Sequence, residues 1–76
     1  MGGSGSEYAR RFGRRLIAAM RESGTTTRRL SRATGLSEST ISTYRCGKAV
    51  PSVEYAAKMA RALGVTLDAL AGSGRR

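Results

Sequence analysis

The chain has 76 residues, with 14 Lys and Arg against 5 Asp and Glu, no histidine and one cysteine, for a formal net charge of +9 at pH 7. This length allows one domain with a small core, and the composition excludes an intrachain disulfide and a Cys/His zinc site. So basic a balance is typical of nucleic-acid binders, although a solubilising surface or an anionic membrane partner would also produce it.

The ends of the chain are rich in Gly and Ser. They predict a flexible leader over residues 1–6, a folded domain over residues 7–71 and a flexible basic tail over residues 72–76. A lone cysteine without a signal-peptide pattern predicts a reducing cytoplasm, with nucleoid association if DNA is the partner. Ends of this composition are also compatible with an engineered protein.

The first predicted helix covers residues 7–23. Ser6 is its expected N-cap, and Gly24 follows its last turn. Its apolar residues recur at helical spacing and form one face: Phe12, Leu16, Ala19 and Met20. This periodicity, without strand alternation anywhere in the chain, predicts an all-α fold.

A second helix is predicted from the Thr26 cap to a stop near Gly35, with Leu30 and Ala33 facing inward. A third begins about three residues later, so the two cannot form a long antiparallel hairpin. A short turn containing glycine between two helices is instead typical of a helix-turn-helix.

The third helix is expected over residues 37–46, capped by Ser37 and held inward by Ile41 and Tyr44. Two more helices follow. Ser52 and Thr66 precede them, Gly64 separates them, and their predicted inward residues are Val53, Ala56, Ala60, Leu63, Leu67 and Leu70.

The outward face of the third helix is composed of short side chains: Ser39, Ser42, Thr43 and Cys46, with Glu38 on the flank. Ser and Thr are weaker helix formers than the Lys, Glu or Gln that usually cover exposed helices. Short hydroxyl side chains let a helix backbone approach a partner closely, and the DNA major groove admits one helix. The alternative is a capped polar surface helix.

Residues 27–46 resemble the helix-turn-helix of the Cro/repressor-type family, also called xenobiotic-response-element-type. The residues that carry the resemblance are Ser31, Gly35, the run Leu36-Ser37-x-Ser39-Thr40-Ile41-Ser42, Gly47-Lys48, Pro51-Ser52 and the segment from Ala60 to Leu70. The likeness extends over residues 12–70. It implies a five-helix lambda-repressor-like domain that binds operator DNA as a transcriptional regulator.

The resemblance also implies which residues meet DNA. Base edges are assigned to Glu38, Ser39, Ser42 and Thr43, and phosphates to Thr27, Arg28, Thr40, Arg45 and Lys48. Thr27 replaces the Gln that usually bonds a phosphate in the family. Met20 and Arg45 stand where the family often has a basic residue and a Glu, so Arg45 is free of that ion pair and is expected to reach a phosphate.

No enzyme is expected, because the chain lacks histidine and a phosphate-binding glycine loop, and Cys46 has no base to activate it. No cofactor, metal, membrane or small-molecule substrate is expected either. A monomer, or a weak homodimer on double-stranded DNA, is the expected state. Two alternatives stay open: a designed DNA-binding protein on this scaffold, and an antitoxin-like or adaptor module that uses the fold to bind protein.

Overall fold

The computed structural model describes the backbone of residues 3–72 and the side chains of residues 7–72. This part of the chain forms helices and no strand, in the order α1 (Gly3–Ser23), α2 (Thr27–Thr34), α3 (Glu38–Arg45), α4 (Val53–Leu63) and α5 (Leu67–Ala71). The predicted all-α, five-helix fold is therefore confirmed. No helix within the described residues is long and apolar enough to cross a membrane.

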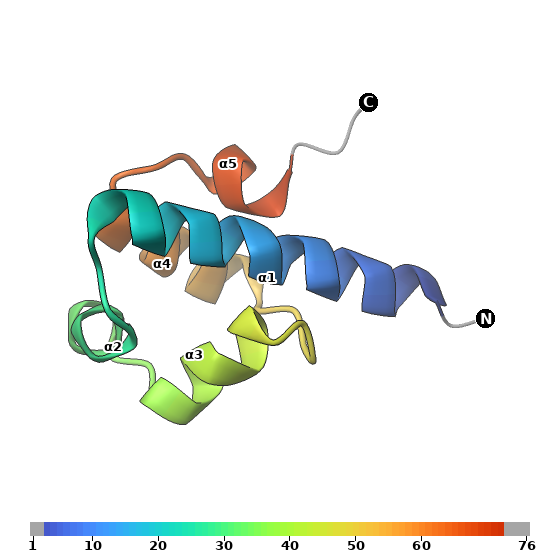
Figure 1. Cartoon of the computed structure of the whole chain (residues 1–76), viewed down its shortest axis with the longest axis horizontal. Helices are drawn as coiled ribbons and strands as arrows, with labels where there is room; N and C mark the ends of the chain where they lie inside the picture. Colours follow the sequence, from blue (N-terminus) through green and yellow to red (C-terminus); the bar gives the residue numbers. More distant parts are fainter. Residues whose placement is uncertain (1–2, 73–76) are drawn as a thin grey trace.

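The long helix α1 is the centre of the arrangement. It lies between α5 on one side and α3 on the other, with α4 behind it (Figure 1). Helix α2 packs against α3 and α4, and α4 also contacts α5. Recognition of a partner through α3 would therefore leave α5 on the opposite side of α1.

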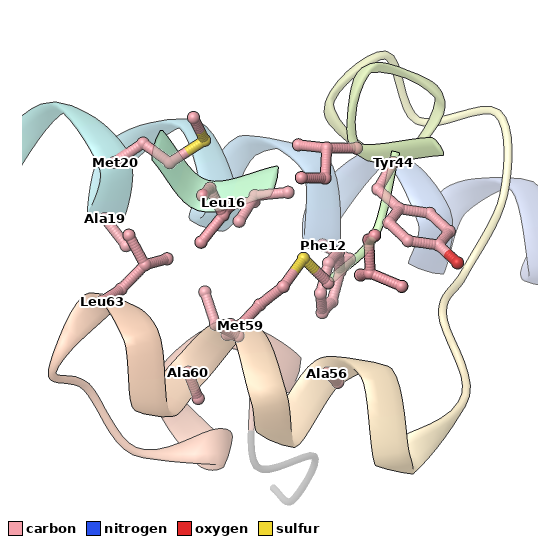
Figure 2. Close-up of a cluster of buried hydrophobic side chains, with 13 residues drawn as sticks. Phe12, Leu16, Ala19, Met20, Tyr44, Ala56, Met59, Ala60 and Leu63 are labelled. Carbon is pink, nitrogen blue, oxygen red and sulfur yellow. The ribbon is translucent and has the colours of Figure 1, made fainter. Parts of the chain in front are cut away.

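Each helix supplies one fully buried side chain to a single core. These residues, each with no exposed surface, are Leu16 of α1, Leu30 of α2, Ile41 of α3, Met59 of α4 and Leu70 of α5. Figure 2 shows the α1 and α4 faces meeting, with Met59 reaching toward Phe12. A chain this short has no second core, so the position of α3 depends on this one cluster.

Hydroxyl side chains cap four of the five helices. Thr26, Ser37, Ser52 and Thr66 each accept a hydrogen bond from the backbone N–H three residues later, at 3.0 to 3.1 Å. The caps predicted at Thr26, Ser37 and Thr66 are confirmed, and Ser52 caps α4 in the same way. A cap of this kind contributes about 1 kcal/mol, which matters for helices of five to eleven residues.

Three details of the sequence prediction are wrong. Helix α1 begins at Gly3 and not at residue 7, so Ser6 lies within the helix and is not its N-cap. Extending an existing helix costs far less than starting one, so weak helix formers can be included. The prediction of flexible ends concerns in part residues 1–2 and 73–76, which lie outside the described residues.

The other two errors concern which side chains face the core. Ala33 is exposed, and Thr34 is buried in its place. Its hydroxyl donates to the Leu30 carbonyl at 2.7 Å and accepts from the Leu36 N–H at 3.2 Å, so burial leaves no polar group unpaired. Val53, the first residue of α4, was expected to face inward but is 74% exposed.

Candidate nucleic-acid interface

The short turn between α2 and α3 determines the angle between these two helices. Gly35 has a φ of +81°, in the left-handed region that favours glycine. The Ser31 hydroxyl donates to the Leu36 carbonyl at 2.5 Å, and the Leu36 side chain is buried. Ser31 therefore does face the turn, as predicted, and closes it by joining the last turn of α2 to the residue after Gly35.

Helix α3 packs against the core along one side. Ile41 has no exposed surface, and Tyr44 is only 8% exposed. At the N-terminal end the Ser37 hydroxyl oxygen accepts from the Thr40 N–H at 3.0 Å and donates to the Thr40 hydroxyl at 2.8 Å. Thr40 is half-buried against this cap. The helix is thus rigidly placed without any contribution from its opposite side.

That opposite side is polar and short. Glu38, Ser39, Ser42 and Cys46 are exposed, and Thr43 is half-buried. The hydroxyls of Ser39 and Ser42 form no hydrogen bond with another described residue, whereas Thr43 Oγ1 donates to the Ser39 carbonyl at 3.0 Å. Thr43 consequently keeps only acceptor capacity and its methyl group for a partner, while the two serines keep both donor and acceptor.

An ion pair crosses from α2 to the first turn of α3. Arg28 Nε lies 3.8 Å from Glu38 Oε2, and both side chains are largely exposed. Two residues assigned separately, Arg28 to phosphate and Glu38 to a base edge, are therefore neighbours. This pairing could not be predicted from helical spacing, because the two residues are on different helices.

Arg45 is half-buried. Its Nη1 donates to Thr27 Oγ1 at 2.9 Å, and its Nε is buried without a partner. The side chain borders a hollow of about 340 Å³ between the end of α1 and the start of α2, with Met20 and Arg21 on the α1 side. Two more of the assigned phosphate residues, Thr27 and Arg45, thus lie together at the N-terminus of α2.

The start of α2 has unpaired donors beside this guanidinium. Thr26 caps the Arg29 N–H, and the N–H groups of the first two residues of any helix have no partner within it. The positive end of the helix dipole disfavours a cation there. Of the five N–H donors of Arg45, one bonds Thr27 and the Nε donor is buried, so the remaining Nη donors and the charge are what the cluster offers an oxyanion.

The C-terminal end of α3 closes tightly. Gly47 has a φ of +75°, and the Lys48 N–H donates to the Thr43 carbonyl at 3.1 Å. This places the exposed Lys48 at the opposite end of α3 from Glu38. The assigned residues therefore do not form one cluster: Arg28 and Glu38 form one pair, Thr27 and Arg45 another, and Lys48 lies apart.

Gly13 is a positioning residue that the sequence reasoning missed. A Cβ at this position would lie 2.8 Å from the carbonyl oxygens of both Tyr44 and Arg45. Only glycine lets α1 approach the end of α3 this closely. The signal was present, because a glycine inside an amphipathic helical pattern indicates a close backbone contact.

The described residues contain no group of three or more Cys, Asp or Glu side chains that could hold a metal ion. The one pKa shift that the structure resolves belongs to Tyr44, whose pKa burial raises above its ordinary value, with a smaller contribution from Tyr55. Its hydroxyl points out of the core cluster (Figure 2).

Comparison with known proteins agrees with this geometry. A family model described as helix-turn-helix matches residues 16–70, which include α2, α3, α4 and most of the core. No curated protein and no solved structure gave a significant match. The matched segment covers well over half of the chain and contains the turn at Gly35, so the chain belongs to the Cro/C1-type helix-turn-helix family of DNA-binding domains.

Proposed function

We propose that the protein binds double-stranded DNA in a sequence-dependent manner, with α3 in the major groove, as the DNA-binding domain of a transcriptional regulator. The observation that carries this proposal is the two-sided character of α3. Ile41 and Tyr44 hold one side to the core, while the other side exposes short polar side chains in a chain of net charge +9. A low-profile polar helix of this kind suits a groove about 12 Å wide.

Base reading falls to Glu38, Ser39, Ser42 and Thr43. A carboxylate accepts from cytosine N4, and serine hydroxyls pair with either donors or acceptors. Thr43, whose hydroxyl already donates to Ser39, is suited to a thymine methyl group. The carboxylate, the two serine hydroxyls and the Thr43 methyl group thus provide three kinds of contact to base edges.

Phosphate binding falls to a second set of residues: Thr27, Arg28, Thr40, Arg45 and Lys48. Arg45 and Thr27 support this role by their position beside the free N–H groups at the start of α2. Arg28 and Lys48 support it as exposed cations at opposite ends of α3. Phosphate contacts orient the helix without reading sequence, so these residues set affinity and salt dependence.

The proposed state is a monomer, or a weak homodimer on DNA.

A second candidate function is protein binding. The observation in its favour is a set of exposed apolar side chains in the loop before α4 and in its first turn, where Val50 is 42%, Val53 is 74% and Tyr55 is 38% exposed. Three partly exposed side chains form a smaller apolar area than most interface cores require, so DNA binding is the preferred function.

Selection of bound duplexes from a random pool at two salt concentrations tests the proposal. A shared site, with affinity that falls steeply as salt rises, is the expected result. Binding without any enriched sequence would mean that the protein binds DNA non-specifically, through charge alone. No binding to duplex DNA at low salt would favour the protein-binding function.

A further inference from the structure

We propose that Arg10 of α1 is an additional phosphate-contacting residue, and that Arg10 and Lys48 together form a clamp on DNA at the C-terminal end of α3. This inference rests on the proposed function. It assigns a DNA contact to α1, a helix outside the helix-turn-helix itself. It also separates Arg10 from Arg11 and Arg15, which lie near it in the sequence but on another part of the helix surface.

The first observation is the contact between Arg10 and the turn after α3. A Cβ added to Gly47 would lie 2.9 Å from both Cα and Cγ of Arg10. The aliphatic part of the Arg10 side chain therefore lies against the turn, and the residue as a whole is exposed. Lys48 is the next residue in that turn. Arg10 and Lys48 are therefore two exposed cations whose backbones meet at the turn after α3.

The second observation is that the arginines of α1 face different ways. Residues three or four apart are neighbours on a helix surface, so Arg10 lies beside Gly13, which meets the end of α3, and also beside Arg14. Arg15 is on the α5 side instead, where a Cβ on Gly72 would lie 2.5 Å from its Nη1. Arg11, four residues before Arg15, shares that face, and the two line a hollow of about 210 Å³ together with Arg14.

The third observation is the charge around this point. Among the described residues the only ion pair joins Arg28 to Glu38, so no carboxylate lies within 4.0 Å of the charged groups of Arg10 or Lys48. Both cations retain their full charge for an external anion. A competing explanation is that they merely stabilise the negative end of the α3 dipole, which cations near a helix C-terminus do.

The position of the pair suits the phosphate backbone. Helix α3 has eight residues and is therefore about 12 Å long, comparable with the width of the major groove. Arg28 lies beside its first turn and the Arg10–Lys48 pair beside its last. Cations at both ends of a helix of this length would lie near the phosphates that border the groove.

The test compares Arg10→Gln with Arg11→Gln, which removes the same charge from the next residue, about 100° around the helix on the side of Arg15. Binding to the selected duplex and to a random duplex is measured between about 50 mM and about 200 mM salt. If Arg10 contacts one phosphate, the affinity ratio of wild type to Arg10→Gln shrinks about 3.5-fold over that range, on both duplexes alike. Arg11→Gln is expected to keep the wild-type salt slope.

Equal salt slopes for the two variants would overturn the inference. So would a lower unfolding midpoint for Arg10→Gln with an unchanged salt slope, because that result assigns Arg10 to the helix dipole alone. The proposed function fails separately. If no sequence is enriched but Arg10→Gln still differs from Arg11→Gln on random duplex, the clamp stands and base reading by α3 does not.

Discussion

Arg28 and Glu38 form an exposed ion pair, 3.8 Å between Arg28 Nε and Glu38 Oε2, that joins α2 to the first turn of α3. Exposed pairs of this type contribute about 0.2–1 kcal/mol at most, so the pair is not needed for stability. Its effect is electrostatic. If α3 lies in the groove as proposed, Arg28 partly neutralises an acid that would otherwise face the phosphates alone.

Glu38→Gln is expected to change the base preference at one position of the site. A carboxylate can only accept hydrogen bonds, as from cytosine N4, whereas the Gln amide can also donate them. Affinity for random duplex is expected to rise, since the variant loses an acid near the phosphates and releases Arg28. Both effects are measured by selection from a random pool and by titration with random duplex.

Glu54→Gln is the matched control, because Glu54 also lies in the first turn of a helix, at the start of α4. It is expected to leave base preference unchanged. If Glu38→Gln behaves in the same way as Glu54→Gln, the Glu38 carboxylate serves only the helix dipole.

Ser39→Ala and Thr43→Ala are expected to weaken binding to the selected duplex more than to random duplex. One lost hydrogen bond or methyl contact corresponds to about 1 kcal/mol, or roughly fivefold in affinity. Arg28→Ala is expected to weaken both duplexes by a similar factor, since phosphate contacts carry no sequence information. Competition titrations give the ratio directly, and equal losses on both duplexes for the Ser39 and Thr43 variants would remove their assignment to base edges.

Arg45→Ala is expected to lower both affinity and the salt slope, the latter by about 0.9 for one lost phosphate contact. Thr27→Val separates this role from a structural one, because it breaks the 2.9 Å hydrogen bond and leaves the guanidinium in place. The salt slope of Thr27→Val should lie close to that of the wild type. Unchanged affinity and salt slope in Arg45→Ala would show that Arg45 only joins α3 to α2.

Gly13→Ala is expected to destabilise the fold. Ala is favoured over Gly within a helix by about 0.5–1 kcal/mol, so propensity alone predicts a gain. The new Cβ would lie 2.8 Å from two backbone carbonyl oxygens, and overpacking of this kind costs about 1–3 kcal/mol. Urea unfolding measures the sign, and a higher midpoint would mean that α1 and α3 separate easily.

Tyr44 is expected to make stability fall at high pH. Burial raises its pKa above the ordinary value of 10.0, so above that pH the unfolded chain loses the phenol proton before the folded one does. The unfolded state then binds fewer protons, and the free energy of unfolding decreases as pH rises through this range. Urea unfolding at neutral pH and near pH 10.5 should show a smaller decrease in Tyr44→Phe than in the wild type.

The helices and their ends were largely predictable from sequence because they depend on local chemistry. Ser37, like the other caps, needs only a hydroxyl three residues before an N–H that lacks a partner. Gly35 and Gly47 were predictable as helix ends because their positive φ favours glycine. The spacing of apolar residues was less informative at the ends of the helices. Ala33, in the last turn of α2, and Val53, the first residue of α4, were predicted to face inward, although both are exposed.

The exposed face of α3 was predictable, but the contacts between helices were not. The Arg28–Glu38 pair and the Arg45–Thr27 hydrogen bond depend on the angle between α2 and α3, which no local rule provides. Arg45 was expected to be free, yet it is half-buried beside Met20. The role of Gly13 likewise depends on how closely α1 approaches α3.

The most direct measurement of whether α3 lies in the groove uses Cys46, the single cysteine of the chain, which is exposed at the end of α3. A DNA-cleaving iron chelate attached to Cys46 is bound to the selected duplex, and the cut positions are mapped. The control carries the chelate on Ala62→Cys in a Cys46→Ser background, since Ala62 is exposed on α4. The proposed function predicts cuts confined to a few base pairs within the selected site from Cys46, and weak or no cleavage from position 62. Equal cleavage from both positions, or cuts spread evenly along the duplex from Cys46, would contradict it.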